Sequence, residues 1–190
     1  MRNNKFNKMV ISFLVALTMM IGCVGCKGKP DENGSMKSDD GRSYGGTIYV
    51  DEGNEAETAF FHVKVDEAYC YDTYQFEDGL YQADQGMAYV VLKLTIRNTY
   101  GKDLPMSITD FILDFEGNEE KNVVTGYGKT ELKDEQYMDN LFTLKQGESI
   151  SKYVMYTVKK KDAYTLKYTE FYEDQLEGDT FCIAVTPKKK

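Results

Sequence analysis

The chain has 190 residues, with 23 Lys and Arg against 31 Asp and Glu, one His and no Trp. This length accommodates one ordinary domain. The acidic balance argues against nucleic acid as a partner and against electrostatic adhesion to an anionic membrane, because both require clustered Lys and Arg.

Residues 1–22 have the pattern of a lipoprotein signal peptide. Basic residues precede an apolar run of 13 residues, Met9 to Ile21, which is shorter than the roughly 20 residues that a membrane-spanning helix needs. Cys23 and Cys26, each preceded by Gly, resemble the Cys of the bacterial lipobox, which is diacylated and becomes the first residue of the mature protein. We expect Cys23 to carry the lipid; Cys26 is the alternative frame, and a plain signal peptide cut nearby is a third interpretation.

The predicted location is therefore the outer face of a bacterial cell membrane, reached by secretion and held by a covalent diacylglycerol anchor. Two acyl chains hold a protein on a bilayer far better than one. Cleavage before Cys23 removes three basic residues and leaves 20 Lys and Arg against 31 Asp and Glu, a net charge of −11.

Residues 23–57 are predicted to form a lipid-anchored flexible linker. The segment is rich in Gly, Ser, Asp, Asn, Lys and Glu, with too little apolar surface to offset the entropy lost on ordering it. About thirty flexible residues have a typical reach of about 30 Å. Within this linker, Thr47–Val50 could form a short strand.

From residue 58 to residue 187 the sequence alternates repeatedly with period two, which indicates half-buried strands. The longest alternation runs from Met87 to Thr99 and ends in the turn Asn98 to Lys102. The other alternating sets are Phe61, Val63 and Val65; Phe111, Leu113 and Phe115; Val154, Tyr156 and Val158; Tyr164, Leu166 and Tyr168; and Phe181, Ile183 and Val185. Between the strands, Lys133 to Phe142 has helical spacing and predicts one short helix or a structured loop.

About seven short strands without a βαβ rhythm indicate an all-β fold, a two-sheet antiparallel sandwich of the immunoglobulin-like kind. Ten Phe and fifteen Tyr suit pleated, half-buried faces. The sequence thus divides into a signal peptide (1–22), a linker (23–57), a sandwich domain (58–187) and a basic tail (188–190).

Two stretches resemble a known family. They are Gly86 to Asn98 followed by Asp110 to Leu113, and Leu144 to Ser149 leading into Tyr153 to Val158. The chain is similar there to exported bacterial lipoproteins that share a C-terminal domain of unknown function with an immunoglobulin-like, telokin-like fold. The resemblance covers roughly residues 60–185. It implies a fold and a location, and it carries no catalytic residues.

The sequence offers little catalytic chemistry. The single histidine, His62, is a conceivable general base, but the neighbouring Lys64 and Asp66 indicate a solvated strand face. No GxSxG, HExxH, GxxxxGK or GxGxxG motif occurs. With one histidine and isolated cysteines, zinc is not expected either. We therefore expect a protein that is not an enzyme and that has no cofactor other than its lipid.

Cys70 and Cys182 are candidates for a disulfide, because such a bond persists outside the membrane and would close a loop of more than a hundred residues. Both lie on the phase opposite the apolar set of their strand, so they could meet on one outer face. The alternative is two separately buried or free thiols.

Two acidic and aromatic segments form a candidate ligand patch. Carboxylates at loop ends could bind calcium, and exposed tyrosines could stack on sugars or cationic groups. Neither segment has the spacing of a calcium loop, so soluble acidic loops with packed tyrosines are the plainer interpretation. The residues of this candidate patch are Tyr71, Asp72, Tyr74, Glu77, Tyr172, Glu173 and Asp174.

The leading hypothesis is a membrane-anchored, non-catalytic sandwich that binds a protein, peptide or glycan through strand edges or loops. The second is a structural or assembly accessory of an envelope complex. A calcium- or glycan-binding surface module is a further alternative, and an enzyme is the least favoured.

Overall fold

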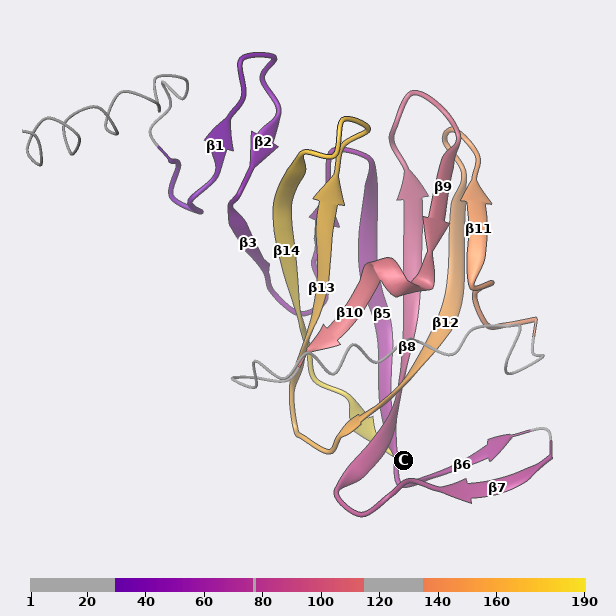
Figure 1. Ribbon diagram of the computed structural model, residues 1–190. Coiled ribbons are helices and arrows are strands. Elements are labelled where there is room, and N and C mark those ends of the chain that lie inside the picture. The colour runs from indigo at the N-terminus through magenta and orange to yellow at the C-terminus, as the bar shows by residue number, and fades with distance from the viewer. Residues whose placement is uncertain (1–29, 77, 115–134) are drawn as a thin grey trace, which may run out of the picture.

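The computed structural model describes residues 30–76, 78–114 and 135–190, and these fold almost entirely into strands (Figure 1). In these ranges the one helical element is a short 3-10 turn, η1 (Ile108–Asp110). The predicted all-β, immunoglobulin-like sandwich is confirmed. Cys23, Cys26, Glu77 and Phe115 lie outside the described residues. No helix within the described ranges is long and apolar enough to cross a membrane.

The larger sheet is built around one long central strand. β8 (Met87–Asn98) pairs antiparallel with β5 (Phe61–Tyr71) on one side and with β12 (Ser149–Lys159) on the other. Two short strands complete the sheet on β5: β4 (Glu55–Glu57), which is antiparallel, and β15 (Lys188–Lys189), which is parallel. The alternation read from the sequence is confirmed, since the side chains of Val90, Leu92, Leu94 and Ile96 are all fully buried.

The second sheet has the strand order β10 (Phe111–Asp114), β13 (Tyr164–Phe171), β14 (Glu177–Val185) and β3 (Thr47–Val50). The first two pairings are antiparallel, and β3 runs parallel to β14. The inner faces of the two sheets share one core, in which the Phe61 ring contacts the rings of Phe111 and Tyr168. Tyr156 is completely buried and its hydroxyl donates to the Phe111 carbonyl oxygen at 3.3 Å.

Three pairs of short strands lie outside the two main sheets. They are β1 (Met36–Lys37) with β2 (Ser43–Tyr44), β6 (Thr73–Phe76) with β7 (Gly79–Gln82), and β9 (Leu104–Ser107) with β11 (Leu141–Leu144). The β6–β7 hairpin lies at the lower end of the molecule in Figure 1, and β1 and β2 lie at the upper end. Of the segment predicted as a helix or structured loop, the described residues 135–140 form a loop that bridges Tyr137 to Tyr153.

A β-bulge in β5 changes which side chains face the core. The pairing with β8 shifts between Val65 and Glu67, so the alternation skips one residue. Val63 points inward before the bulge, and Cys70 belongs to the same core cluster after it. The phase read from the sequence for Cys70 is therefore wrong, because a strand with a bulge does not keep one period along its length.

The linker predicted for residues 23–57 is wrong from Asp31 onward. β3 is an edge strand of the second sheet and β4 pairs with β5. The segment is ordered with little apolar surface of its own, because its backbone forms hydrogen bonds with β14 and β5 of the sandwich. The predicted basic tail is also paired: β15 lies along β5, and the Lys190 N–H donates to the Cys70 carbonyl oxygen at 3.0 Å.

Candidate functional site

An open cleft of about 730 Å³ lies between β9 and β13, next to η1. Its lining is mainly apolar and aromatic, with charged side chains among the lining residues. The apolar lining residues are Phe60, Phe61, Tyr100, Leu104, Pro105, Met106, Ile112, Tyr168 and Phe171.

The cleft exists because β10 is shorter than its neighbour. β10 begins at Phe111, which faces Tyr168, whereas β13 continues to Phe171. Before Phe111 the chain turns away through η1, whose capping box joins Ser107 and Asp110. Past Tyr168, β13 therefore pairs only with β14 among the described strands. This capping box is also the one sequence signal that could have marked the break in the strand.

The opposite wall of the cleft is β9. Among the described strands β9 pairs with β11 alone, and its residues Leu104, Pro105 and Met106 line the cleft. Two strand edges thus border the same apolar space. Edges of this kind present backbone N–H and C=O groups that can pair with an added strand.

The floor of the cleft is a packed aromatic layer. Phe61 is 1% exposed, and its ring lies 4.7 Å from that of Tyr168, centroid to centroid. Phe60 packs edge-on against Tyr100 at 5.2 Å and against Tyr172 at 5.3 Å. Phe171 is by contrast 64% exposed at the rim. The buried aromatic floor and the exposed aromatic rim offer a ligand an apolar surface, and the carboxyls of Asp103, Asp110 and Glu173 line the same cleft.

Asn98, at the end of β8, fixes the loop that forms one lip of the cleft. Its amide nitrogen lies within hydrogen-bond distance of the carbonyl oxygens of Lys102 (2.9 Å), Leu144 (2.9 Å) and Lys145 (3.1 Å). Its side-chain oxygen accepts from the Tyr100 N–H at 2.8 Å. The Asn that ends the longest predicted strand is therefore a structural residue that positions the lip.

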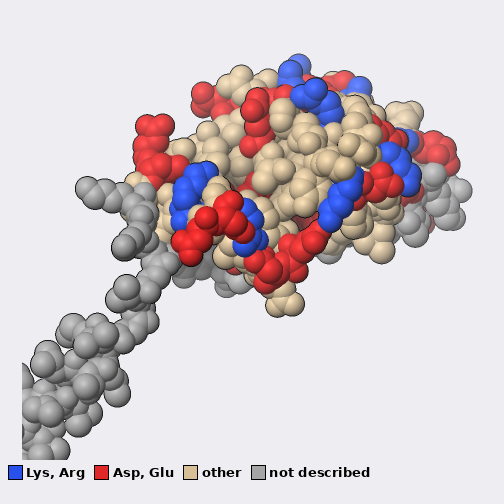
Figure 2. Space-filling view, turned by 90° about the horizontal axis from the view of Figure 1, so that it is seen from above, with Lys and Arg blue, Asp and Glu red and all other residues tan. Residues whose placement is uncertain are grey.

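The charges around the cleft neutralise one another. Lys102 pairs with Glu173, and the Lys145 ammonium lies 2.8 Å from Asp103, which lowers the pKa of that carboxyl. Burial raises the pKa of the Tyr168 hydroxyl, so it stays protonated. Figure 2, which looks down on this end of the molecule, shows Lys and Arg interspersed with Asp and Glu. The cleft thus has no strong field of one sign to attract a highly charged ligand.

His62 lies on the outer face of the larger sheet. Its Nδ1 is 3.1 Å from Glu55 Oε2 and 3.0 Å from the Arg97 guanidinium. Glu55, Glu57 and His62 bring possible ligand atoms within 4.8 Å of one another. Arg97, however, already supplies a positive charge at His62, so this group gives no reason to place a cation there.

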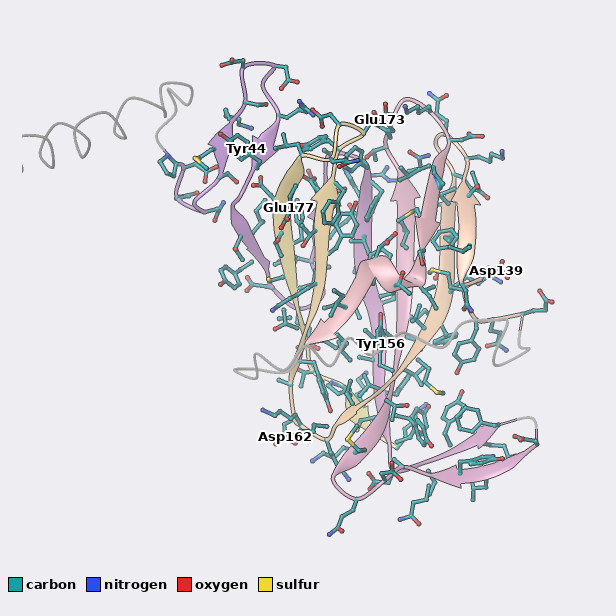
Figure 3. The ribbon with its side chains drawn as sticks, in the orientation of Figure 1. Tyr44, Asp139, Tyr156, Asp162, Glu173 and Glu177 are labelled. Atoms are coloured by element: carbon teal, nitrogen blue, oxygen red, sulfur yellow. The ribbon has the colours of Figure 1, made fainter. Side chains whose placement is uncertain are left out.

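The structure does not bring the two halves of the predicted ligand patch together. Tyr71 ends β5, Asp72 follows it and Tyr74 lies in β6; at this end Lys160 Nζ lies 2.5 Å from Asp72 Oδ1. Tyr172, Glu173 and Asp174 form the β13–β14 turn at the opposite end. Figure 3 shows Glu173 at the upper end and Asp162, close to Lys160 in sequence, at the lower end. The two segments separate because β5 and β13 run in opposite directions, so that Phe61, at the start of β5, packs on Tyr168 near the end of β13. Glu77 lies outside the described residues.

Cys70 and Cys182 are buried thiols with no bond between them. Cys70 lies in the core, and burial raises the pKa of its thiol. Cys182 pairs with Lys167 and Tyr49 in the second sheet. The two cannot share an outer face, because β5 and β14 belong to different sheets, and the bulge in β5 also turns Cys70 inward.

Comparisons with known proteins give a match to one protein family. Residues 50–179 match the family described as Domain of unknown function (DUF4352). A search of curated proteins found no significant match.

Three solved structures illustrate the likeness. YcdA of Bacillus subtilis subsp. subtilis str. 168, described as a candidate lipoprotein, is 18% identical with a TM-score of 0.50, over 73% of this chain and 40% of that protein. The YjhA protein of Bacillus subtilis is 12% identical with a TM-score of 0.48, over 70% of this chain and 98% of its own. An uncharacterized β-sandwich protein of Clostridium difficile 630 is 11% identical with a TM-score of 0.44, over 74% and 95%.

At 18% identity the likeness to YcdA shows the fold alone, and this chain spans 40% of the length of that protein. The family match is the firmer relation, since it covers more than half of the chain. The chain therefore belongs to the family described as Domain of unknown function (DUF4352).

Proposed function

We propose that this protein is a lipid-anchored surface lipoprotein whose non-catalytic sandwich binds an extended peptide segment in the cleft between β9 and β13. The lipid is carried by Cys23, or by Cys26 in the alternative frame, on the outer face of the cell membrane. The observation that carries the binding proposal is the pair of strand edges that border one apolar cleft.

Strand addition fits this arrangement. An extended peptide that pairs with a free sheet edge gains main-chain hydrogen bonds, and its alternate side chains fill pockets beside the edge. From Thr169 to Phe171, β13 extends beyond the start of β10 and offers an edge about 10 Å long at roughly 3.3 Å per residue. Phe61, Met106 and Tyr168 form an apolar surface for the inward side chains.

The size and polarity of the cleft support the same ligand class. A volume of about 730 Å³ lies within the range of ligand pockets, about 300–1,000 Å³. The neutralised ion pairs Lys102–Glu173 and Lys145–Asp103 favour apolar side chains over highly charged ones.

The anchor is supported by the signal peptide pattern and by YcdA, a structural relative described as a candidate lipoprotein. The mass of the mature N-terminus tests it. We expect a chain that begins at Cys23 with added diacylglycerol, whereas an intact Met1 without lipid would refute the anchor.

The binding proposal is tested with a phage-displayed library of 12-residue peptides panned on the purified domain. We expect the selected peptides to be extended and apolar at alternate positions, and Phe171→Ala to weaken their binding about 5- to 30-fold, the effect of losing an aromatic contact of about 1–2 kcal/mol. Tyr49→Ala is the matched control, because Tyr49 is an exposed aromatic residue, 80% accessible, on β3 and outside the cleft. Equal affinity for Phe171→Ala and wild type, or a library without binders, would refute strand addition in the cleft.

A further inference from the structure

The segment before the sandwich, residues 31–50, forms a folded clasp. Asp31 Oδ1 accepts from the N–H groups of Asn33 and Ser35, both at 2.9 Å, and the Thr47 N–H donates to the Asn33 carbonyl oxygen at 3.0 Å. Gly46 permits the closure, because a Cβ there would lie 2.7 Å from the Ser35 nitrogen. The clasp therefore has internal structure of its own.

The clasp is fastened to the sandwich through residues 42–50. β3 pairs with β14, and the bonds continue upstream, since Gly45 N–H donates to the Gly178 carbonyl oxygen at 3.1 Å. At its outer tip, the Arg42 guanidinium donates to both carboxylate oxygens of Asp174, at 2.8 and 2.9 Å, and lies over the ring of Tyr172. Figure 3 shows Tyr44 of the clasp at the same end of the molecule as Glu173.

One buried carboxylate depends on this docking. Asp179, which is 3% exposed, accepts from the Gly46 N–H at 2.8 Å. The neighbouring Glu170, also 3% exposed, accepts from the Ala59 N–H at 2.6 Å, outside the clasp. A buried carboxylate without its donors is costly, so detaching the clasp would expose or orphan Asp179. The buried carboxylate of Asp179 therefore stabilises the docked clasp, in addition to the hydrogen bonds within the clasp.

A docked clasp leaves very little chain between the anchor and the folded protein. Six residues lie between Cys23 and Pro30, so the seven Cα–Cα steps span at most about 25 Å. A chain free from Cys23 to residue 57 would span up to about 120 Å at the same rise per residue. The length of free chain between the anchor and the folded protein determines how far the domain can move from the membrane surface.

We infer that the clasp holds the sandwich against the outer surface of its own membrane, with the end that carries the clasp and the β13–β14 turn facing the lipid headgroups. This inference rests on the proposed lipid anchor. The surface that this end of the sandwich faces is the lipid headgroup layer. Because positive and negative charges are mixed at that end, the short chain between Cys23 and Pro30, and not electrostatic adhesion, holds the sandwich there (Figure 2). The lip of the cleft at Lys102 lies at the same end, next to Glu173. The peptides that reach the cleft are then those close to the membrane surface.

The test uses the full-length lipidated protein in phosphatidylglycerol vesicles that contain a trace of acceptor-labelled lipid. A donor dye is placed on Gly101→Cys, in the open loop after β8 at the clasp end, or on Gln85→Cys, in the exposed turn before β8 at the other end. β8 is 12 residues long, so the two sites differ in height by about 40 Å if the strand stands upright. Cys70 and Cys182 are buried, and Cys26 is replaced by Ser in the protein anchored through Cys23, so labelling is directed to the introduced thiol.

We expect energy transfer to the lipid to be several-fold stronger from Gly101→Cys than from Gln85→Cys. Adding Gly46→Ala, which opens the clasp, should remove most of that difference. Equal transfer from the two sites in the protein with an intact clasp would overturn the inference and needs no clasp variant to interpret. A failure of the lipid anchor gives a different result, because the protein would carry no acyl mass and would not sediment with the vesicles.

Discussion

β8 and the N-terminal clasp are both firmly placed, but by different forces. In β8 every second side chain is buried in the core, and Leu94 is fully inaccessible. The clasp places few large apolar side chains in the core and is held instead through backbone bonds to β14 and to the buried Asp179. Hydrophobic periodicity therefore detects the first kind of order and misses the second.

The largest expected effect is on stability, when a core side chain of β8 is truncated. Leu94→Ala removes a fully buried side chain from the central strand and should lower the free energy of unfolding by about 2–5 kcal/mol. Arg97→Ala, on the exposed face of the same strand, should change it by less than about 1 kcal/mol. Urea titrations of both variants measure this. A loss below about 1 kcal/mol for Leu94→Ala would mean that the core is not packed as described.

An intermediate effect is expected where the clasp closes. In Gly46→Ala the new methyl group would meet the Ser35 backbone at 2.7 to 2.9 Å, and relieving that contact should cost about 1–3 kcal/mol. Gly101→Ala is the control, because nothing lies within 4 Å of its added Cβ. Limited proteolysis should cut Gly46→Ala first between residues 31 and 57. Equal protection of the two variants would contradict the docked clasp.

The smallest effect concerns the pH dependence of the buried Glu170. Burial raises the pKa of its carboxyl in the folded protein above the unfolded value, so the folded state holds the extra proton between the two values. The contribution of Glu170 to stability is therefore fully present below the unfolded pKa and is lost as the pH rises through the folded pKa.

Glu170→Gln keeps an acceptor for the Ala59 N–H and removes this titration. The stability of wild type relative to Glu170→Gln should increase as the pH is lowered from 7.5 toward about 4.5, the unfolded value. Urea midpoints of both proteins at several pH values provide the comparison. A difference that stays constant with pH would show that Glu170 does not titrate as a buried group.

The sequence predicted the sandwich well because its strands alternate strictly. The residues that face the core as expected include Val90, Leu92, Leu94, Ile96, Phe181, Ile183 and Val185. Local pattern could not locate the bulge at Asp66, which reversed the phase of Cys70, nor the parallel pairing of β3 with a strand about 130 residues later.

Local sequence pattern could not predict the cleft for a related reason. It depends on where β10 begins relative to β13 and on β9 lacking a second partner among the described strands. These are properties of strand ends in space. The separation of the two ligand-patch segments was equally hidden, because the composition of two loops does not reveal that β5 and β13 run in opposite directions.

The most direct test of the docked clasp is ¹⁵N relaxation on a chain that lacks residues 1–26. The account predicts backbone order parameters near 0.85 for Gly46 and for Thr47–Val50, equal to those of β8. Values below about 0.6 at those positions, with β8 rigid, would show a flexible linker and would contradict the account.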